Sequence, residues 1–364
     1  MDELPLVLLL QIAEHSLDTW KSLVFAHPRV GRWSLQPEYQ RYIQRKYTRC
    51  IEHQQPDVIV RQYKLCGKYH NVDGPALELS CGTKMWYKHG ERHRPKEDGN
   101  LPAVEYANRT KEWWLNGLLH RDDGPAIEHN NGTKEWYKSG LCHRDGGLPA
   151  YECTNGHKEW SINGKLHRDG DLPAVENADG SKLWYKHGQQ HRDGDLPAFE
   201  GADGSKKWYK YDELHRDGDL PAIEHADGTK YWYSDGLRHR DGDLPAVIQA
   251  DGTRKWYKND KCHREGGPAI ERPNGTKYWY QNGKCHRDDD LPAMIYADGT
   301  KKWYKDNLLH RDDDLPAIEG PKGRKGRRFR AWYKNGLRHR DGDLPAVEHA
   351  NGTKEWWQND QRCQ

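Results

Sequence analysis

The sequence predicts a mainly β protein, in which a small α-helical N-terminal domain precedes an elongated array of antiparallel β-hairpin repeats. A segment of about 24 residues recurs about twelve times between Pro75 and Trp356, and a fixed period of this length is typical of a repeat array. Twelve of the 16 tryptophans occupy one position of the repeat. Because only 34% of the residues are hydrophobic, we expect a thin core built around these tryptophans.

Residues 1–60 carry no repeat and form the predicted helical domain. Their apolar residues recur at spacings typical of short packed helices, and they are Leu4, Leu8, Leu9, Ile12, Leu17, Trp20, Leu23 and Val24. Pro28 and Gly31 should end the second helix. The segment from Pro37 to Lys46 is expected to start a third helix, with proline at its first position.

The array is expected over residues 61–364, and its internal spacings describe one copy. Each array tryptophan except the last is followed by histidine seven residues later. Each Pro-Ala pair, with one exception, is followed by tryptophan eleven residues after the proline. The separation from histidine to the next proline takes values of five, six and nine residues. Two fixed spacings and one variable spacing predict two tight turns and one adjustable loop in each copy.

The copy around Trp232 shows how the strands are expected to pair. Asp227-Gly228 and Asp235-Gly236 are strong signals for hairpin turns. If both loops contain two residues, Ile223 lies opposite Trp232, and Trp232 lies opposite His239. The other face of the sheet is then expected to carry Glu224, Tyr231 and Tyr233.

Stacking of neighbouring copies must bury the aromatic side chains, because one copy is too small to bury its own. Burying most of a tryptophan contributes a few kcal/mol at roughly 25 cal/mol per Å². We call the array tryptophans the seam tryptophans. The predicted structural seam includes Trp184, His191, Trp208, His215, Trp232, His239, Trp256 and His263.

A His-Arg-Asp run recurs in most copies and has three interpretations. Asp241-Gly-Asp243 offers two carboxylates to a calcium ion, but further carboxylates for a closed site are missing. Catalysis is disfavoured, because an active site is not normally repeated in every copy. In the preferred interpretation the histidine packs against the seam tryptophan, the arginine pairs with a neighbouring carboxylate, and the aspartate caps the loop. We therefore expect no catalytic residue, no metal site and no cofactor.

One copy departs from the pattern at residues 321–330, where six of ten residues are basic. These residues are Lys322, Arg324, Lys325, Arg327, Arg328 and Arg330. The segment is either a nuclear-localisation or nucleic-acid patch or a solvated loop lengthened by five residues.

Composition favours a protein that works inside the cell. The net charge is +2, with 58 basic and 56 acidic residues, which argues against bulk attraction to nucleic acid or to a membrane. The eight cysteines include no C-x-x-C pair, so we expect reduced thiols. The apolar run Leu6–Leu10 is short and lacks a basic preceding segment, so neither a signal peptide nor a bilayer-spanning stretch is expected.

Two families are similar to parts of the chain. The Trp-Tyr-Lys-x-Gly strand and turn resemble a divergent MORN-type repeat, although His-Arg-Asp-Gly-Asp-Leu-Pro-Ala is not part of that motif. The N-terminal segment resembles an F-box through Leu4-Pro5, Leu8, Leu9 and Ile12, followed by Leu17–Val24 with Pro28-Arg29 and Trp33. It departs at Val7, where many F-boxes have an acidic residue. The combination is similar to F-box and repeat proteins of large DNA viruses of amoebae, such as marseillevirus relatives.

The F-box resemblance implies docking on a Skp-family adaptor of a cullin-RING ubiquitin ligase. The residues implied are Leu4, Pro5, Leu8, Leu9, Ile12, Trp20, Leu23 and Val24; alternatively, they cap the open end of the array. The sequence thus predicts a non-enzymatic adaptor in the cytoplasm, whose array binds a protein target. The alternative is a structural scaffold or virion component that self-associates. A target should touch the two residues after each turn glycine and the varied residue before each seam tryptophan, such as Met85, Glu112, Leu183, Lys207, Tyr231 and Ala331.

Overall fold

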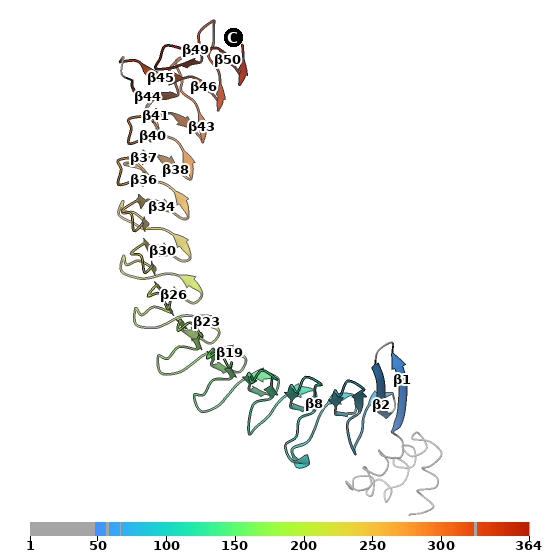
Figure 1. The fold of residues 1–364 in the computed structure, drawn as a ribbon. Coiled ribbons are helices and arrows are strands. Elements are labelled where there is room, and N and C mark those ends of the chain that lie inside the picture. The colour runs from blue at the N-terminus through green and yellow to red at the C-terminus, as the bar shows by residue number, and fades with distance from the viewer. Residues whose placement is uncertain (1–47, 56–57, 66, 324–325, 364) are drawn as a thin grey trace, which may run out of the picture. The chain divides into compact units, whose positions relative to one another are not determined.

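The computed structural model describes residues 48–55, 58–65, 67–323 and 326–363. The helices expected before residue 48, with Leu4, Pro5, Leu8, Leu9, Ile12, Trp20, Leu23 and Val24, lie outside the described residues. The chain divides into two compact units, Met1–His167 and Arg168–Gln364. Each unit is a succession of antiparallel hairpins that follow one another along the chain (Figure 1), which confirms the predicted hairpin array.

In the first unit, each copy contributes one hairpin to a continuous sheet and a second, separate hairpin. The sheet strands, in order, are β1 (Arg49–Gln55), β2 (Val58–Leu65), β4 (Leu77–Leu79), β5 (Lys84–Met85), β8 (Val104–Glu105), β9 (Lys111–Glu112), β12 (Ile127–Glu128), β13 (Lys134–Glu135), β16 (Tyr151–Glu152) and β17 (Lys158–Glu159), with β3 (Lys68–Tyr69) also on β2. The second hairpins are β6 (Tyr87–Lys88) with β7 (Glu91–Arg92), β10 (Trp114–Leu115) with β11 (Leu118–Leu119), β14 (Tyr137–Lys138) with β15 (Leu141–Cys142), and β18 (Ser161–Ile162) with β19 (Lys165–Leu166). A short 3₁₀-helix, η1, spans Lys96–Asp98.

The second unit repeats this arrangement. Its sheet strands are β20 (Val175–Glu176), β21 (Lys182–Leu183), β24 (Phe199–Glu200), β25 (Lys206–Lys207), β28 (Ile223–Glu224), β29 (Lys230–Tyr231), β32 (Val247–Ile248), β33 (Arg254–Lys255), β36 (Ile270–Glu271), β37 (Lys277–Tyr278), β40 (Met294–Ile295), β41 (Lys301–Lys302), β44 (Ile318–Lys322), β45 (Arg328–Ala331), β48 (Val347–Glu348) and β49 (Lys354–Glu355). Its second hairpins are β22 (Tyr185–Lys186) with β23 (Gln189–Gln190), β26 (Tyr209–Lys210) with β27 (Glu213–Leu214), β30 (Tyr233–Ser234) with β31 (Leu237–Arg238), β34 (Tyr257–Lys258) with β35 (Lys261–Cys262), β38 (Tyr280–Gln281) with β39 (Lys284–Cys285), β42 (Tyr304–Lys305) with β43 (Leu308–Leu309), β46 (Tyr333–Lys334) with β47 (Leu337–Arg338), and β50 (Trp357–Gln358) with β51 (Gln361–Arg362).

The predicted register of the first hairpin in each copy was wrong. Ile223 pairs with Tyr231 rather than with Trp232. The reason is a loop of three residues instead of two. The His225 N–H donates to the Thr229 carbonyl at 2.9 Å, and the Gly228 N–H donates to the His225 carbonyl at 2.9 Å. Gly228 has a φ of 89°, as expected where a type I turn ends in a left-handed residue. Because side chains alternate between faces, this one-residue shift removes Tyr231 from the face predicted for it.

The second hairpin follows the prediction. Tyr233 pairs with Arg238 across the two-residue loop Asp235-Gly236. The two loop residues have φ values of 49° and 75°, which is the type I′ turn that Asp-Gly favours. The His239 N–H donates to the Trp232 carbonyl at 3.2 Å, so the predicted opposition of Trp232 and His239 is confirmed.

Tryptophan and alanine fill the core of each copy. The alanine of every Pro-Ala pair in the described array, such as Ala222 and Ala246, has no exposed surface. Most seam tryptophans are between 5% and 7% exposed, among them Trp184, Trp208, Trp232 and Trp256. Within the described residues, no helix is long and apolar enough to cross a membrane. Free thiols are found at Cys81, Cys142, Cys153, Cys262, Cys285 and Cys363.

The hairpin pattern begins before residue 61. Strand β1 pairs with β2 along its whole length, from Arg49 opposite Lys64 to Gln55 opposite Val58, so residues 49–55 are strand within the range expected to be helical. Tyr63 takes the place of a seam tryptophan, since its N–H donates to the Ala76 carbonyl at 2.8 Å and its carbonyl accepts from the His70 N–H at 3.0 Å. The first copy is thus a hairpin with longer strands and a half-buried tyrosine at the tryptophan position.

His70 should make this first copy sensitive to acid. Its side chain is fully buried, and its Nδ1 accepts the His89 N–H at 3.1 Å. Burial, followed by the nearby His89 and Lys88, lowers the pKa of His70 from 6.5 to about 4. Because the folded-state pKa lies below the unfolded value, the opened copy binds the proton first between pH 6.5 and 4. The contribution of neutral His70 to the stability of the first copy is therefore complete above this pH window, and it is lost as the pH falls through the window.

The measurement is hydrogen exchange of the His89 amide between pH 7 and 4.5, corrected for the intrinsic exchange rate. We expect its protection to fall on acidification, and to fall less in the His70→Gln variant. An equal fall in both proteins would contradict this account.

Candidate functional site

The recurring His-Arg-Asp run of each copy lies in the loop that joins this copy to the next. In the copy of Trp232 this loop runs from His239 to Ala246, between β31 and β32. Its Gly242 and Asp243 have φ values of 72° and 55°, so the backbone reverses through the left-handed region. The loop therefore presents its side chains to both neighbouring copies.

The loop arginine is held by a ring, by a carboxylate and by a backbone carbonyl. The Arg240 guanidinium lies 3.9 Å from the centroid of the Trp232 ring. Its Nε and Nη2 donate to Asp219 Oδ1 and Oδ2 of the preceding copy at 2.7 and 3.0 Å. Its Nη1 donates to the Pro245 carbonyl at 3.2 Å. The planar fork matches a carboxylate and stacks well on an aromatic face, and this hydrogen bonding lowers the pKa of Asp219.

The same aspartate also binds the tryptophan. The Trp232 Nε1–H donates to the Asp219 carbonyl at 3.0 Å, so Asp219 satisfies Arg240 and Trp232 together. We call this set the Arg–Asp–Trp joint. It recurs in the second unit as Arg192–Asp171–Trp184, Arg216–Asp195–Trp208, Arg264–Asp243–Trp256, Arg311–Asp290–Trp303 and Arg340–Asp314–Trp332.

The loop histidine reaches the following copy. His239 Nδ1 accepts the Asn259 N–H at 3.3 Å, and its Nε2 lies 3.0 Å from Asp241 Oδ1. Because a backbone N–H can only donate, Nδ1 is unprotonated and the proton is assigned to Nε2. The sequence predicted that histidine packs against the seam tryptophan, whereas the guanidinium stacks on that ring and the imidazole holds the next hairpin turn.

A third contact between copies was missed from the sequence. The Thr229 hydroxyl is buried and accepts the Ala250 N–H of the next copy at 3.1 Å. The Thr229 N–H in turn donates to Asp227 Oδ1 at 2.7 Å. Ser205 and Thr276 bind the following copy in the same way. The signal available in the sequence was a threonine or serine two residues after the aspartate or asparagine of most first turns.

The contacts between copies use the polar groups that suggested chemistry. Asp243, one of the two aspartates considered for calcium, binds Arg264 Nε at 2.8 Å. In the part of the chain that the structure describes, no group of three or more His, Cys, Asp and Glu residues could hold a metal ion. The arrangement supports a structural role for His-Arg-Asp.

Short joining loops leave the next tryptophan less covered. Three loops, at residues 70–75, 120–125 and 263–268, are one residue shorter than the common loop. The tryptophans that follow them, Trp86, Trp136 and Trp279, are only half-buried. Among the described residues, none accepts a hydrogen bond from their indole N–H groups, whereas Trp256 Nε1–H donates to the Asp243 carbonyl at 3.0 Å.

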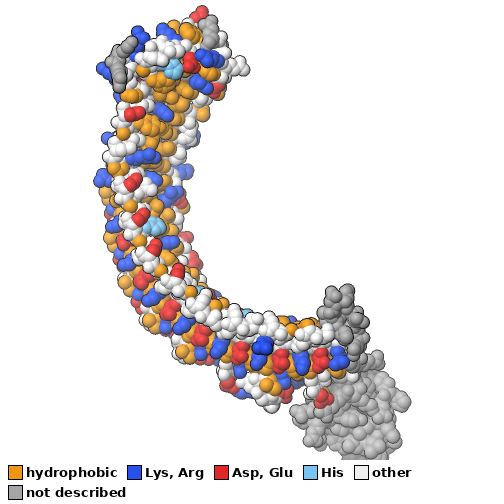
Figure 2. Space-filling view, viewed as in Figure 1, with side chains coloured by type: hydrophobic (Ala, Val, Ile, Leu, Met, Phe, Trp, Pro, Cys, Tyr) orange, Lys and Arg blue, Asp and Glu red, His pale blue; other side chains and the backbone are white. Residues whose placement is uncertain are grey.

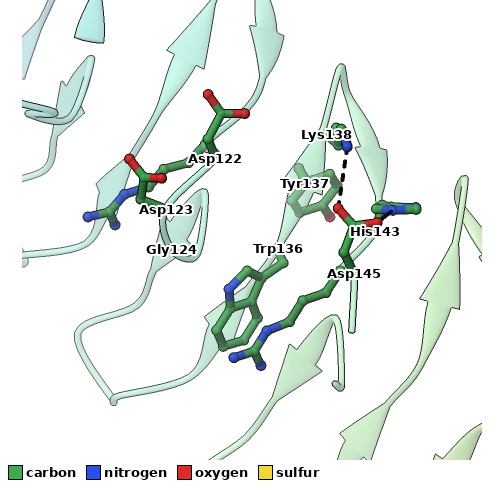
Figure 3. Close-up of a pocket in the computed structure, with 10 residues that line it drawn as sticks. Asp122, Asp123, Gly124, Trp136, Tyr137, Lys138, His143 and Asp145 are labelled. Atoms are coloured by element: carbon green, nitrogen blue, oxygen red, sulfur yellow. Dashed lines mark hydrogen bonds and ion pairs between the residues drawn. The ribbon is translucent and has the colours of Figure 1, made fainter. Parts of the chain in front are cut away.

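Each short loop from residue 120 onwards leaves a pocket beside the exposed ring. The pocket at Trp136 has a volume of about 290 Å³. Figure 3 shows that the carboxylates of Asp122 and Asp123 point away from the Trp136 ring, while Lys138 and His143 bind Asp145. Arg144 in this pocket keeps a carboxylate partner, because its Nη1 donates to Glu152 at 2.7 Å. The sequence predicted the adjustable loop but not the pockets that it opens.

The basic segment is an extension of a first hairpin. Strands β44 and β45 lengthen the pair and contain a register shift between Glu319 and Lys322. The Gly323 N–H donates to the Arg327 carbonyl at 2.7 Å, and the Gly326 N–H to the Gly323 carbonyl at 2.9 Å. The same pair of hydrogen bonds closes the first hairpin of the Trp232 copy. Of the predicted basic patch, Lys322, Arg327 and Arg330 are exposed, Arg328 lies 3.8 Å from Glu319, and Arg324 and Lys325 lie outside the described residues.

The predicted seam residues come together as paired positions in each copy, whereas the predicted adaptor-binding residues before residue 48 cannot be placed. No model of a known protein family matches the chain, and no curated protein matches its sequence.

The Arg–Asp–Trp joint predicts energetic coupling across copies. Asp219 is the carboxylate partner of Arg240, since Ile248 occupies the position where Glu224 pairs with Arg216 in the preceding copy. Asp219→Asn and Arg240→Gln should each lower the local opening free energy by about 2 kcal/mol, the range for hydrogen bonds to charged groups. The double variant should lose little more than either single variant.

Local opening is measured by native-state hydrogen exchange, because repeat arrays need not unfold in two states. Asp241→Asn is the matched control: this aspartate lies in the same loop as Arg240 but binds His239. In the double-mutant cycle of Asp241→Asn with Arg240→Gln, the two losses of local opening free energy should add. Additivity in the Asp219 cycle would show that the joint contributes no coupling.

Proposed function

We propose that this chain is a non-enzymatic adaptor inside the cell. Its divergent MORN-type array binds a protein target, and its F-box-like N-terminal segment recruits a Skp-family adaptor and thereby a cullin-RING ubiquitin ligase. The proposal needs no cofactor and no catalytic residue. The basic hairpin of residues 321–330 would direct the protein to the nucleus.

The observation that carries the proposal is a division between recurring and varied positions. The recurring His, Arg, Asp and Thr side chains hold neighbouring copies together. The first residue after the second turn varies and is exposed in every copy from residue 118 to residue 337. These residues are Leu118, Leu141, Lys165, Gln189, Glu213, Leu237, Lys261, Lys284, Leu308 and Leu337. A surface that differs from copy to copy on a constant scaffold is suited to recognising an extended protein.

A second exposed row is apolar. Leucine precedes every Pro-Ala pair of the second unit except Pro268-Ala269. These leucines are between 38% and 47% exposed, and the row consists of Leu172, Leu196, Leu220, Leu244, Leu291, Leu315 and Leu344. Figure 2 shows charges of both signs interspersed on the visible face of the array. Apolar side chains among mixed charges favour a protein target over a polyanion.

The residue before each seam tryptophan is less accessible than the sequence suggested. Lys207 and Tyr231 are half-buried, and Ala331 is 1% exposed. Because these side chains lie in the continuous sheet, target contacts should fall mainly on the exposed residues after the second turns and on the leucine row.

Recruitment is tested by a pull-down of the full chain, probing for the Skp-family adaptor and for cullin. The Leu8→Asp/Leu9→Asp variant should lose the adaptor, because two carboxylates would be forced into an apolar interface. The matched control is Leu237→Asp, the same change at an exposed array position, which should retain it. Far-ultraviolet circular dichroism checks that the array stays folded in each variant.

An adaptor retained by the Leu8→Asp/Leu9→Asp variant, or absent from all samples, would contradict the recruitment role. The structural scaffold or virion component, with the N-terminal segment as its cap, would then be the better description.

A further inference from the structure

Arg287 is the exception among the arginines of the joining loops. It stacks on Trp279 at 4.0 Å, and its Nη1 donates to the Pro292 carbonyl at 3.3 Å, as in other copies. Each of the other described loop arginines has a carboxylate oxygen within 4.0 Å; they are Arg94, Arg121, Arg144, Arg168, Arg192, Arg216, Arg240, Arg264, Arg311 and Arg340. Within the described residues, no carboxylate pairs with Arg287.

Two sequence changes coincide at this arginine. Gly266 stands in the short loop where the common loop has the aspartate that binds the next arginine, as Asp243 binds Arg264. Ile295 stands eight residues after Arg287, where Glu224 follows Arg216. Arg287 thus retains its place on the tryptophan ring but has lost both acceptors.

Trp279 shares this lack of an acceptor. In the preceding copy, Asp243 offers its carboxylate to Arg264 and its carbonyl to the Trp256 Nε1–H at 3.0 Å. At Trp279 and Arg287, no described residue supplies either group. Both side chains instead line a pocket of about 360 Å³ together with Gly266 and Gly267 of the short loop.

The charge of Arg287 makes this pocket receptive to an anion. Partial burial lowers the pKa of Arg287 without a compensating carboxylate, yet a guanidinium stays charged at neutral pH. A half-buried cation without a directly paired carboxylate gains most from a ligand that forms charge-assisted hydrogen bonds.

Acidic residues on the pocket rim limit the ligand to a single carboxylate. Glu265, Asp288 and Asp289 also line the pocket. Asp288 accepts hydrogen bonds from Gln281 at 2.7 Å and from His286 at 2.9 Å, and Glu265 lies 3.8 Å from Lys258. These carboxylates would repel nucleic acid or a run of acidic residues more strongly than a single carboxylate, because the repulsion grows with the number of ligand charges.

We propose that Arg287 and Trp279 form a binding site for one aspartate residue in an extended segment of the target protein. The aspartate carboxylate would take the guanidinium fork, and its backbone carbonyl would accept the indole N–H. These are the two groups that Asp243 supplies to Arg264 and Trp256. The inference rests on the proposed capture of a protein by the array, and it assigns one contact of that target.

The test is a titration of the ¹⁵N-labelled full chain with N-acetyl-aspartate N′-methylamide, a capped residue that offers both acceptors. The indole N–H resonance of Trp279, assigned with Trp279→Phe, should shift saturably, while that of Trp256 should not move. Capped asparagine should bind about tenfold more weakly, because it exchanges a charge-assisted contact for a neutral one. Equal binding of the two probes, or no shift of Trp279, would overturn the proposal.

Acetate separates a peptide source from a free carboxylate. It should also bind more weakly than capped aspartate, since it has no carbonyl for the indole; equal binding would overturn the peptide part of the proposal. Arg287→Gln should abolish the shift. If that variant does not fold, the comparison of aspartate with asparagine on the unaltered chain still decides the proposal.

A third variant, Gly266→Asp, fills the site from within the chain. A Cβ at Gly266 meets no atom within 4 Å, so the new side chain can enter the pocket and should weaken binding of the capped aspartate. None of these experiments uses the N-terminal segment, so failure of the pull-down leaves this result unaffected. If the chain binds capped aspartate but recruits no ligase, the adaptor role is refuted and the aspartate site stands.

Discussion

The Arg–Asp–Trp joint is the interaction on which the rest of the second unit depends. A copy of about 24 residues cannot bury a tryptophan alone, and the joint supplies the missing partner from the loop of the preceding copy. Arg240 covers one face of Trp232, and Asp219 binds both side chains. Thr229 and His239 extend the contact to the turns of the following copy. In this copy, the turns and the joining loop therefore all form hydrogen bonds with a neighbouring copy.

These contacts between neighbouring copies explain how so hydrophilic a chain folds. The array has few large aliphatic residues in its core, and its buried surface comes from tryptophan, alanine and the stacked arginine stems. It also explains why function is expected in the irregular copies. Shortening one loop by a single residue uncovers Trp279. Among the described joining loops, only the arginine stacked on Trp279 lacks a carboxylate partner, because Gly266 and Ile295 replace both acceptors. Because the joint is the same in most copies of the second unit, a copy that lacks it is a candidate for a binding role.

The sequence predicted the period, the second turn and the opposition of Trp232 and His239, because Asp-Gly at a two-residue loop has one strongly preferred geometry. The first turn has the same Asp-Gly signal but contains three residues, so Ile223 was paired one residue too far along the chain. The partner of Arg240 was predicted only as a carboxylate, since the contact with Asp219 joins residues 21 positions apart in different copies. The pockets depend on how a loop covers a ring, which spacing alone does not show.

The measurement that tests the joint most directly is hydrogen exchange at the tryptophan indoles, resolved by ¹⁵N nuclear magnetic resonance. Trp208, Trp232 and Trp256, whose indoles donate to an aspartate carbonyl, should exchange slowly. Trp279, which follows a short loop and is half-buried, should exchange much faster. Equal rates for all four tryptophans would show that the joint does not close the contact between copies.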